Sequence, residues 1–137
     1  MSDSASKPRP QFRNIGFLQI LSYRLPLAGK SSIFHRISGA LLILCLPLVI
    51  VPLFALSVTS AESYASIATW MANPLCKVVL LVIIWAYLHH FCAGIRFLTL
   101  DLHLANDKIS AQKTAGVVFG VSLVLTVIFG LKLFGAW

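Results

Sequence analysis

Three long apolar runs constrain this chain more than any other feature of its sequence. They extend over residues 31–57, 74–100 and 114–137. Each is long enough to cross a hydrocarbon core of about 30 Å, which takes roughly 20 helical residues. Hydrophobic residues make up 58% of the chain and charged residues only 11%, a balance far from that of a soluble domain. The sequence therefore predicts an all-α membrane protein with three transmembrane helices.

The chain divides into an N-terminal arm and a transmembrane domain. Residues 1–30 mix polar, basic and apolar side chains, as expected of a segment that lies at a membrane surface. Residues 31–137 form the predicted transmembrane domain, with helices at about 31–57, 74–100 and 110–136. Three helices bury little core of their own. We therefore expect the domain to be part of a larger heteromeric helix bundle that a partner completes.

Prolines and glycines mark the expected ends and bends of these helices. Pro26 and Gly29 are expected to separate the arm from the first helix. Pro47 and Pro52 fall inside that helix, where they are expected to bend it. Residues 58–73 are predicted to form a loop, and the Asn-Pro pair at its end is typical of a helix start.

Basic residues predict the orientation of the chain. The segment before the first helix carries five of them: Lys7, Arg9, Arg13, Arg24 and Lys30. The stretch 58–73 carries Glu62 as its one charged residue, whereas the second connection contributes Lys108 and Lys113. Because Lys and Arg are retained on the cytoplasmic side of short loops, the N-terminus is predicted to be cytoplasmic.

The net charge of +7 raises the question of a nucleic-acid partner. The basic residues lack the interleaved aromatic platforms of single-strand binders, so membrane lipid with anionic headgroups is the expected partner instead. The N-terminal segment also lacks the apolar core of a secretory signal and the Arg-rich pattern of a transit peptide. These features favour a bacterial inner (cytoplasmic) membrane over a mitochondrial inner membrane.

A polar stripe opens the first predicted helix. Ser32, His35, Arg36 and Gly39 stand at i, i+3, i+4 and i+7, so one face of the helix carries them all. The stripe enters the bilayer at its predicted cytoplasmic boundary. There Arg36 is explained either as an interfacial anchor that extends to the headgroups or as part of a polar site, and the neighbouring His35 favours the site.

Two adjacent histidines lie deep in the second predicted helix. His90 follows Pro74 by sixteen residues, which is about 24 Å along a helix axis. A histidine facing lipid at that depth is costly, so His89 and His90 should each face a partner helix, a cavity or a cofactor. A neutral imidazole nitrogen also binds haem iron.

Spacing does not choose between the two histidines. One helical stripe comprises His90, Gly94, Phe97 and Asp101, and the other comprises His89, Ala93, Arg96 and Leu100. Gly94, one turn from His90, is expected to leave room for a flat and bulky group. An interhelical hydrogen bond and a cofactor or proton path stay open for both histidines.

Two motifs resemble those of a known family. The first is Ser-x-x-His-Arg-x-x-Gly over residues 32–39, and the second is His-x-x-x-Gly-x-Arg over residues 90–96, followed by Asp101. With the chain length, the three helices and the Arg9-Pro10 opening of the arm, they resemble the cytochrome b membrane-anchor subunit, or large anchor subunit, of succinate dehydrogenase (respiratory complex II).

The resemblance implies roles for single residues. His90 is similar to the axial ligand of the iron of a b-type haem whose second histidine comes from the small anchor subunit, and His89 becomes a bystander. His35 and Arg36 are implied to lie near the haem propionates. Ser32, Arg36 and Asp101 are implied to belong to a ubiquinone site. Many members of the family have a histidine where this chain has Phe97.

The resemblance also implies a division of labour. A flavoprotein subunit oxidises succinate, an iron–sulfur subunit passes electrons to ubiquinone, and this chain and the small hydrophobic anchor subunit hold both at the membrane. The chain itself is not expected to be an enzyme on its own, although its complex serves the tricarboxylic acid cycle and aerobic electron transport. The alternatives are a fumarate reductase anchor, a small transporter or proton-conducting subunit, and a passive scaffold.

Overall fold

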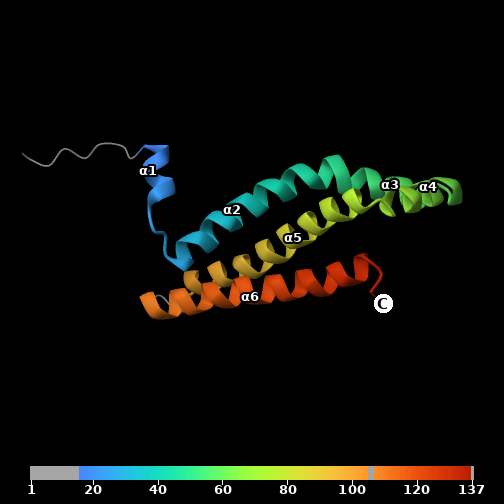
Figure 1. Ribbon diagram of the computed structural model, residues 1–137. Coiled ribbons are helices and arrows are strands. Elements are labelled where there is room, and N and C mark those ends of the chain that lie inside the picture. Colours follow the sequence, from blue (N-terminus) through green and yellow to red (C-terminus); the bar gives the residue numbers. More distant parts are fainter. Residues whose placement is uncertain (1–15, 105–106, 137) are drawn as a thin grey trace, which may run out of the picture.

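The chain folds into helices throughout the part that the computed structural model describes, residues 16–104 and 107–136. In chain order these are α1 (Phe17–Ser22), α2 (Leu27–Cys45), a π-helical turn η1 (Leu46–Ile50), α3 (Val51–Thr59), α4 (Ala61–Met71), α5 (Pro74–Asp101) and α6 (Lys108–Leu133). Figure 1 shows α2, α5 and α6 running alongside one another, with α1 set apart at one end. Lys7, Arg9 and Arg13 lie outside the described residues.

Three helical segments are long and apolar enough to cross a membrane. They are Leu27–Thr59 with 33 residues, Pro74–Asp101 with 28 and Lys108–Leu133 with 26. The first is continuous through α2, η1 and α3. The prediction of an all-α protein with three apolar spans is therefore confirmed.

The first span begins earlier than expected because another helix caps it. Pro26 has extended backbone angles and precedes α2, but Gly29 lies inside the helix, so its predicted role as a separator was wrong. The backbone N–H of Leu27 donates to Oε1 of Gln112 on α6 at 3.0 Å. This bond satisfies one of the free N–H groups of the first helical turn.

Local capping sets both ends of α6. At its start the Asp107 carboxylate accepts from the Ser110 N–H at 2.9 Å, and the hydrogen bonds from Ser110 hold the pKa of Asp107 below its usual range. At its end Gly135 adopts a φ of 83° and Ala136 N–H donates to the Leu131 carbonyl. A glycine in this left-handed conformation terminates a helix, which is why α6 ends before the predicted residue 136.

The connection predicted as a loop is largely helical, so that prediction was wrong. Helix α4 occupies most of it and packs against α3 and α5. Ser60 and Ser63 form reciprocal side-chain to backbone hydrogen bonds at its start, a capping box that stabilises a short helix. Its apolar residues recur at helical spacing, a local signal of this helix in the sequence.

The prolines of the first span change its hydrogen-bonding register without breaking it. Pro47 lies in the π-helical turn η1, and Pro52 stands at the start of α3. Proline lacks an N–H and its ring displaces the preceding carbonyl, so a wider turn is the local solution. Figure 1 shows the ribbon bending over near this turn, as expected from the sequence.

Small and polar side chains fill the core where α2, α5 and α6 meet. The buried apolar residues are mainly small: Ala86, Leu88, Ala93, Ala115 and Val118. The buried polar residues are Ser31, Ser38, His89, Arg96, Ser122 and Thr126. Most large apolar side chains face outward. This distribution is typical of membrane helices, which approach closely through small residues and pair polar groups inside the bundle.

Candidate functional site: an imidazole in an apolar groove

His90 is held against α2 by its own ring nitrogen. Its Nδ1 lies 3.0 Å from the backbone carbonyl oxygen of His35 and 3.3 Å from the hydroxyl of Ser38. A carbonyl oxygen only accepts hydrogen bonds, so Nδ1 carries the proton and donates it. In a neutral imidazole this leaves an unprotonated lone pair on Nε2, which has no hydrogen-bond partner among the described residues.

The ring of His35 completes the seat of His90. The two imidazoles stack with ring centroids 4.1 Å apart and planes inclined by 9°. His35 in turn contacts Phe97, with ring centroids 5.0 Å apart. A Cβ built on Gly94 would lie 3.8 Å from Nε2 of His35, so the room expected beside this glycine borders the His35 ring.

An apolar groove of about 780 Å³ lies beside His90 between α2, η1 and α5. Its walls are Gly39, Leu42, Ile43, Cys45, Leu46, Ile50, Ile83, Ile84, Tyr87, Leu88, His90 and Phe129. The lining is aliphatic and aromatic apart from the His90 imidazole and the polar tips of Cys45 and Tyr87. Such a groove suits a large apolar group that needs one nitrogen ligand.

His89 occupies the opposite environment. It is 0% exposed, and its Nδ1 lies 3.3 Å from the hydroxyl of Ser122 on α6. Aromatic rings of Phe34, Trp85 and Phe119 surround it, with the Trp85 ring stacked at 5.4 Å. The structure thus separates two histidines that spacing left equivalent: His89 joins helices in the core, and His90 borders the groove.

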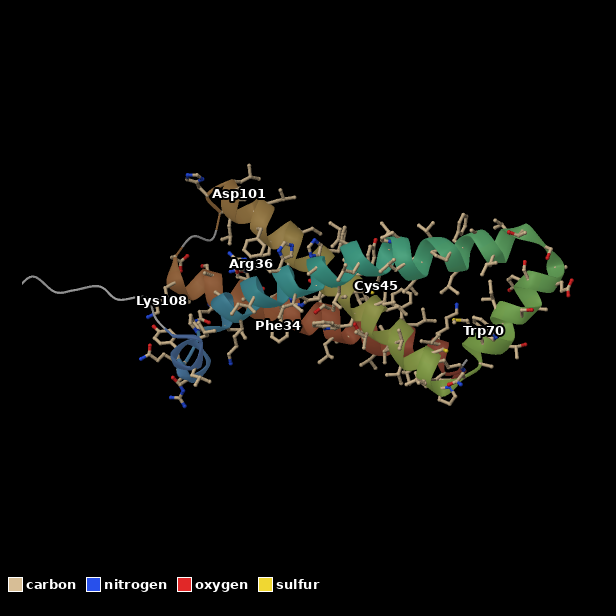
Figure 2. The ribbon with its side chains drawn as sticks, turned by 90° about the horizontal axis from the view of Figure 1, so that it is seen from above. Phe34, Arg36, Cys45, Trp70, Asp101 and Lys108 are labelled. Carbon is tan, nitrogen blue, oxygen red and sulfur yellow. The ribbon has the colours of Figure 1, made fainter. Side chains whose placement is uncertain are left out.

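The remaining predicted site residues lie at one end of the bundle. Figure 2 shows Arg36 and Asp101 near the end that carries Lys108, with Trp70 at the far end. Arg36 and Asp101 are exposed and Ser32 is half-buried. Within residues 16–104 and 107–136 no hydrogen bond joins these three side chains to one another. The structure therefore brings His35 and His90 into contact and places Arg36 and Asp101 at the same end without joining them.

A family comparison connects this geometry with known proteins. The succinate dehydrogenase/fumarate reductase transmembrane subunit family matches residues 7–129, a range that contains both motifs. The chain belongs to this family. The succinate dehydrogenase cytochrome b556 subunit of Coxiella burnetii is 31% identical over 114 residues, covering 83% of this chain and 91% of that protein. The protein of the same name from Paracoccus denitrificans is 35% identical over 107 residues, covering 77% and 81%.

Sequence reasoning missed two polar contacts of this family member. The hydroxyl of Ser38 lies 3.3 Å from Nδ1 of His90, but Ser38 is not one of the motif residues. The sequence indicated this contact only through the position of Ser38, one helical turn after His35. Arg96 is buried: its Nε donates to the Thr114 hydroxyl at 3.0 Å, and its Nη2 to the Ala111 carbonyl at 3.1 Å. Arg96 therefore joins α5 to α6, and its guanidinium carbon also lies 5.4 Å from the centre of the Phe97 ring.

The described part of the chain holds no cluster of three His, Cys, Asp or Glu side chains that could bind a metal ion. Among the side chains that line the groove, His90 supplies the one imidazole, which makes it this chain's candidate ligand for an iron there. Three features fit that role: an apolar groove, a free Nε2 and an Nδ1 fixed by a carbonyl. Metal-bound histidines commonly donate their second nitrogen to such a carbonyl.

Proposed function

We propose that this chain is the cytochrome b membrane-anchor subunit of a succinate dehydrogenase, that it binds a b-type haem together with the small hydrophobic anchor subunit, and that it forms part of the ubiquinone-reduction site. The two relatives above bear the name cytochrome b556 subunit. The observation that carries the proposal is the seat of His90, whose Nδ1 donates to the His35 carbonyl while Nε2 stays free beside an apolar groove.

The residues around the groove divide the work of holding a haem. His90 would be the axial ligand to the iron, and the apolar walls would exclude water from the macrocycle. His35 and Arg36 would hold the two propionates, which need cationic or hydrogen-bonding partners. A bound haem supplies reversible one-electron chemistry. The second axial histidine would come from the small anchor subunit.

The ubiquinone site would lie at the end of the bundle that carries Arg36 and Asp101. Ser32 would donate a hydrogen bond to a quinone carbonyl, and Arg36 would stabilise the negative charge that develops on reduction. Asp101 is the last residue of α5, and its side chain is exposed. It would pass protons from water toward the quinol. Arg36 is free of hydrogen bonds to the other described residues, which leaves its guanidinium available for this contact.

The end of the bundle that carries Arg36, Asp101 and Lys108 also bears on the proposed membrane orientation and on the proposed partner subunits. With the N-terminus cytoplasmic, Arg36, Asp101 and Lys108 face the cytoplasm, where the iron–sulfur and flavoprotein subunits would dock. The outward-facing apolar side chains of the bundle would be covered by lipid or by further helices. The small hydrophobic anchor subunit would pack over the groove at His90. A bacterial inner membrane is the proposed location, consistent with the two bacterial relatives.

A fumarate reductase anchor is the nearest alternative, since the family includes both kinds of subunit. The two cytochrome b556 relatives favour the succinate dehydrogenase. The transporter interpretation predicts transport without haem, and the scaffold interpretation predicts that replacing either histidine changes stability alone. Membership in this family favours the anchor over both.

The test is a visible spectrum of the complex purified by a tag on this chain from its native membrane. We expect a dithionite-reduced minus air-oxidised difference spectrum of a b-type haem, with flavin in the same fraction. A complex that contains flavin but no haem would overturn His90 as a ligand and leave the anchor role. A chain that purifies without flavin or haem would overturn the proposal and favour the transporter.

A further inference from the structure

Gly39 touches the ring of His90 more closely than any side chain would allow. A Cβ built on Gly39 would lie 2.9 Å from Cε1 of His90 and 3.3 Å from its Nδ1. Separations below 3.0 Å do not occur for real Cβ atoms, because ordinary carbon contacts begin near 3.5 Å. Even the smallest replacement, alanine, would therefore force the imidazole or α2 to move.

The imidazole has little freedom to yield. Its Nδ1 donates to the His35 carbonyl at 3.0 Å, and its face stacks on the His35 ring at 4.1 Å. Ser38 lies 3.3 Å from the same nitrogen. A rotation that relieved the contact with a new Cβ would break the hydrogen bond that keeps the proton on Nδ1.

We propose that Gly39 is a positioning residue for His90: by having no side chain, it lets the imidazole reach the His35 carbonyl and so sets the direction in which Nε2 meets the groove. Gly39 itself lines the same groove. The steric contact stands by itself, whereas its consequence for haem rests on the proposed function. A substitution at Gly39 is therefore predicted to act by displacing the His90 ring, and not by a general change in helix packing.

The chain offers two matched glycine controls. A Cβ on Gly130 would lie 2.9 Å from Cδ1 of Leu81, which is an equally close contact with no imidazole involved. A Cβ on Gly120 would meet nothing within 4 Å. Gly130→Ala therefore reports the cost of a tight α5–α6 contact, and Gly120→Ala reports the cost of the substitution alone.

The first measurement is the haem content and the reduced-minus-oxidised spectrum of each purified complex. We expect Gly39→Ala to bind haem about ten-fold more weakly and to shift the spectrum of what remains, as second-sphere changes at metal-bound histidines do. Both control complexes should keep their haem. Gly130→Ala should lower the unfolding temperature relative to Gly120→Ala, which itself should raise it slightly because alanine favours a helix more than glycine does. A Gly39→Ala complex with normal haem content and spectrum would overturn the inference.

The second measurement is a double-mutant cycle on the unfolding temperature. In a His90→Ala background the ring that Gly39 accommodates is gone, so Gly39→Ala should cost much less than it does beside the native histidine. An equal loss in both backgrounds would assign Gly39 to helix packing only. If Gly39→Ala alone fails to assemble, assembly of the double variant becomes the readout, and failure of both would contradict the inference.

These measurements separate the inference from the proposed function. A wild-type complex without haem would overturn the haem site, while the cycle would still report whether Gly39 acts through His90. A wild-type complex with haem that Gly39→Ala does not alter would overturn the inference alone.

Discussion

Two neighbouring residues of α5 sit in two different regions of the molecule, the closed core between α2, α5 and α6 and the open groove beside α2. One residue along a helix turns the side chain by about 100°, so His89 faces the core and His90 faces the groove. The core encloses the His89 ring among aromatic side chains and the Ser122 hydroxyl. His90 lines the groove, whereas His89 is 0% exposed. Nε2 has no hydrogen-bond partner among the described residues in either histidine, so the adjoining groove is what distinguishes His90.

The two arginines repeat the contrast. Arg96 is buried and donates hydrogen bonds to two groups of α6, whereas Arg36 is exposed at the end of the bundle. A charged group inside the bundle needs partners from the same chain, and its role there is to hold helices together. A charged group at the rim is exposed and can be reached from outside the chain.

The largest difference is expected between the two histidines. His90→Leu should abolish the b-type haem signal because the iron loses its ligand from this chain, and His89→Leu should retain most of it. His89→Leu should instead lower the free energy of unfolding by about 1 kcal/mol, through loss of the Ser122 hydrogen bond and of the ring contacts with Trp85 and Phe119. The reduced-minus-oxidised spectrum and thermal unfolding in detergent measure the two effects. The reverse order of haem loss would show that core and groove had been assigned to the wrong residues.

Replacing each arginine by leucine should have a smaller effect than replacing His90. Arg36→Leu should change quinone reduction, whereas Arg96→Leu should change stability. Arg36→Leu should slow ubiquinone reduction by about ten-fold or more while succinate oxidation with a soluble dye continues, because developing charge loses its cation. Arg96→Leu should leave both rates near normal and lower the free energy of unfolding by about 1 to 3 kcal/mol.

The two assays and thermal unfolding check this pair, and each arginine serves as the control for the other. Equal loss of stability in both variants would contradict the contrast between rim and core. Unchanged quinone kinetics in Arg36→Leu would remove Arg36 from the proposed site.

The smallest effect should come from the Ser122 hydroxyl. Ser122→Ala removes the polar partner of His89, and such interhelical bonds contribute about 0.6 kcal/mol in membrane bundles. Ser66→Ala on α4 is the control, since its hydroxyl bonds only within its own helix, to the Glu62 carbonyl. Thermal unfolding should show a small loss for Ser122→Ala, little change for the control, and unaltered haem in both. A changed haem spectrum in Ser122→Ala would mean that the core contributes to the site.

The sequence by itself determined the three apolar spans, the start of α5 at Asn73-Pro74, the disturbance of the first span at Pro47 and the two motifs. These depend on run length, helical period and the chemistry of single residues, all of which are local properties. It also predicted that His35 and Arg36 share a stripe with Gly39, and Figure 2 shows Arg36 and Asp101 at the same end of the bundle.

Only the tertiary structure decided which histidine borders the groove, where Arg96 finds its partners and which ring lies against Gly39. His35 and His90 are 55 positions apart, and their contact depends on the rotation of α2 against α5, which no helical period encodes. The early start of α2 has the same origin, since its first N–H is capped by Gln112 of α6. Local sequence sets which residues share a face; packing between helices sets what each face meets.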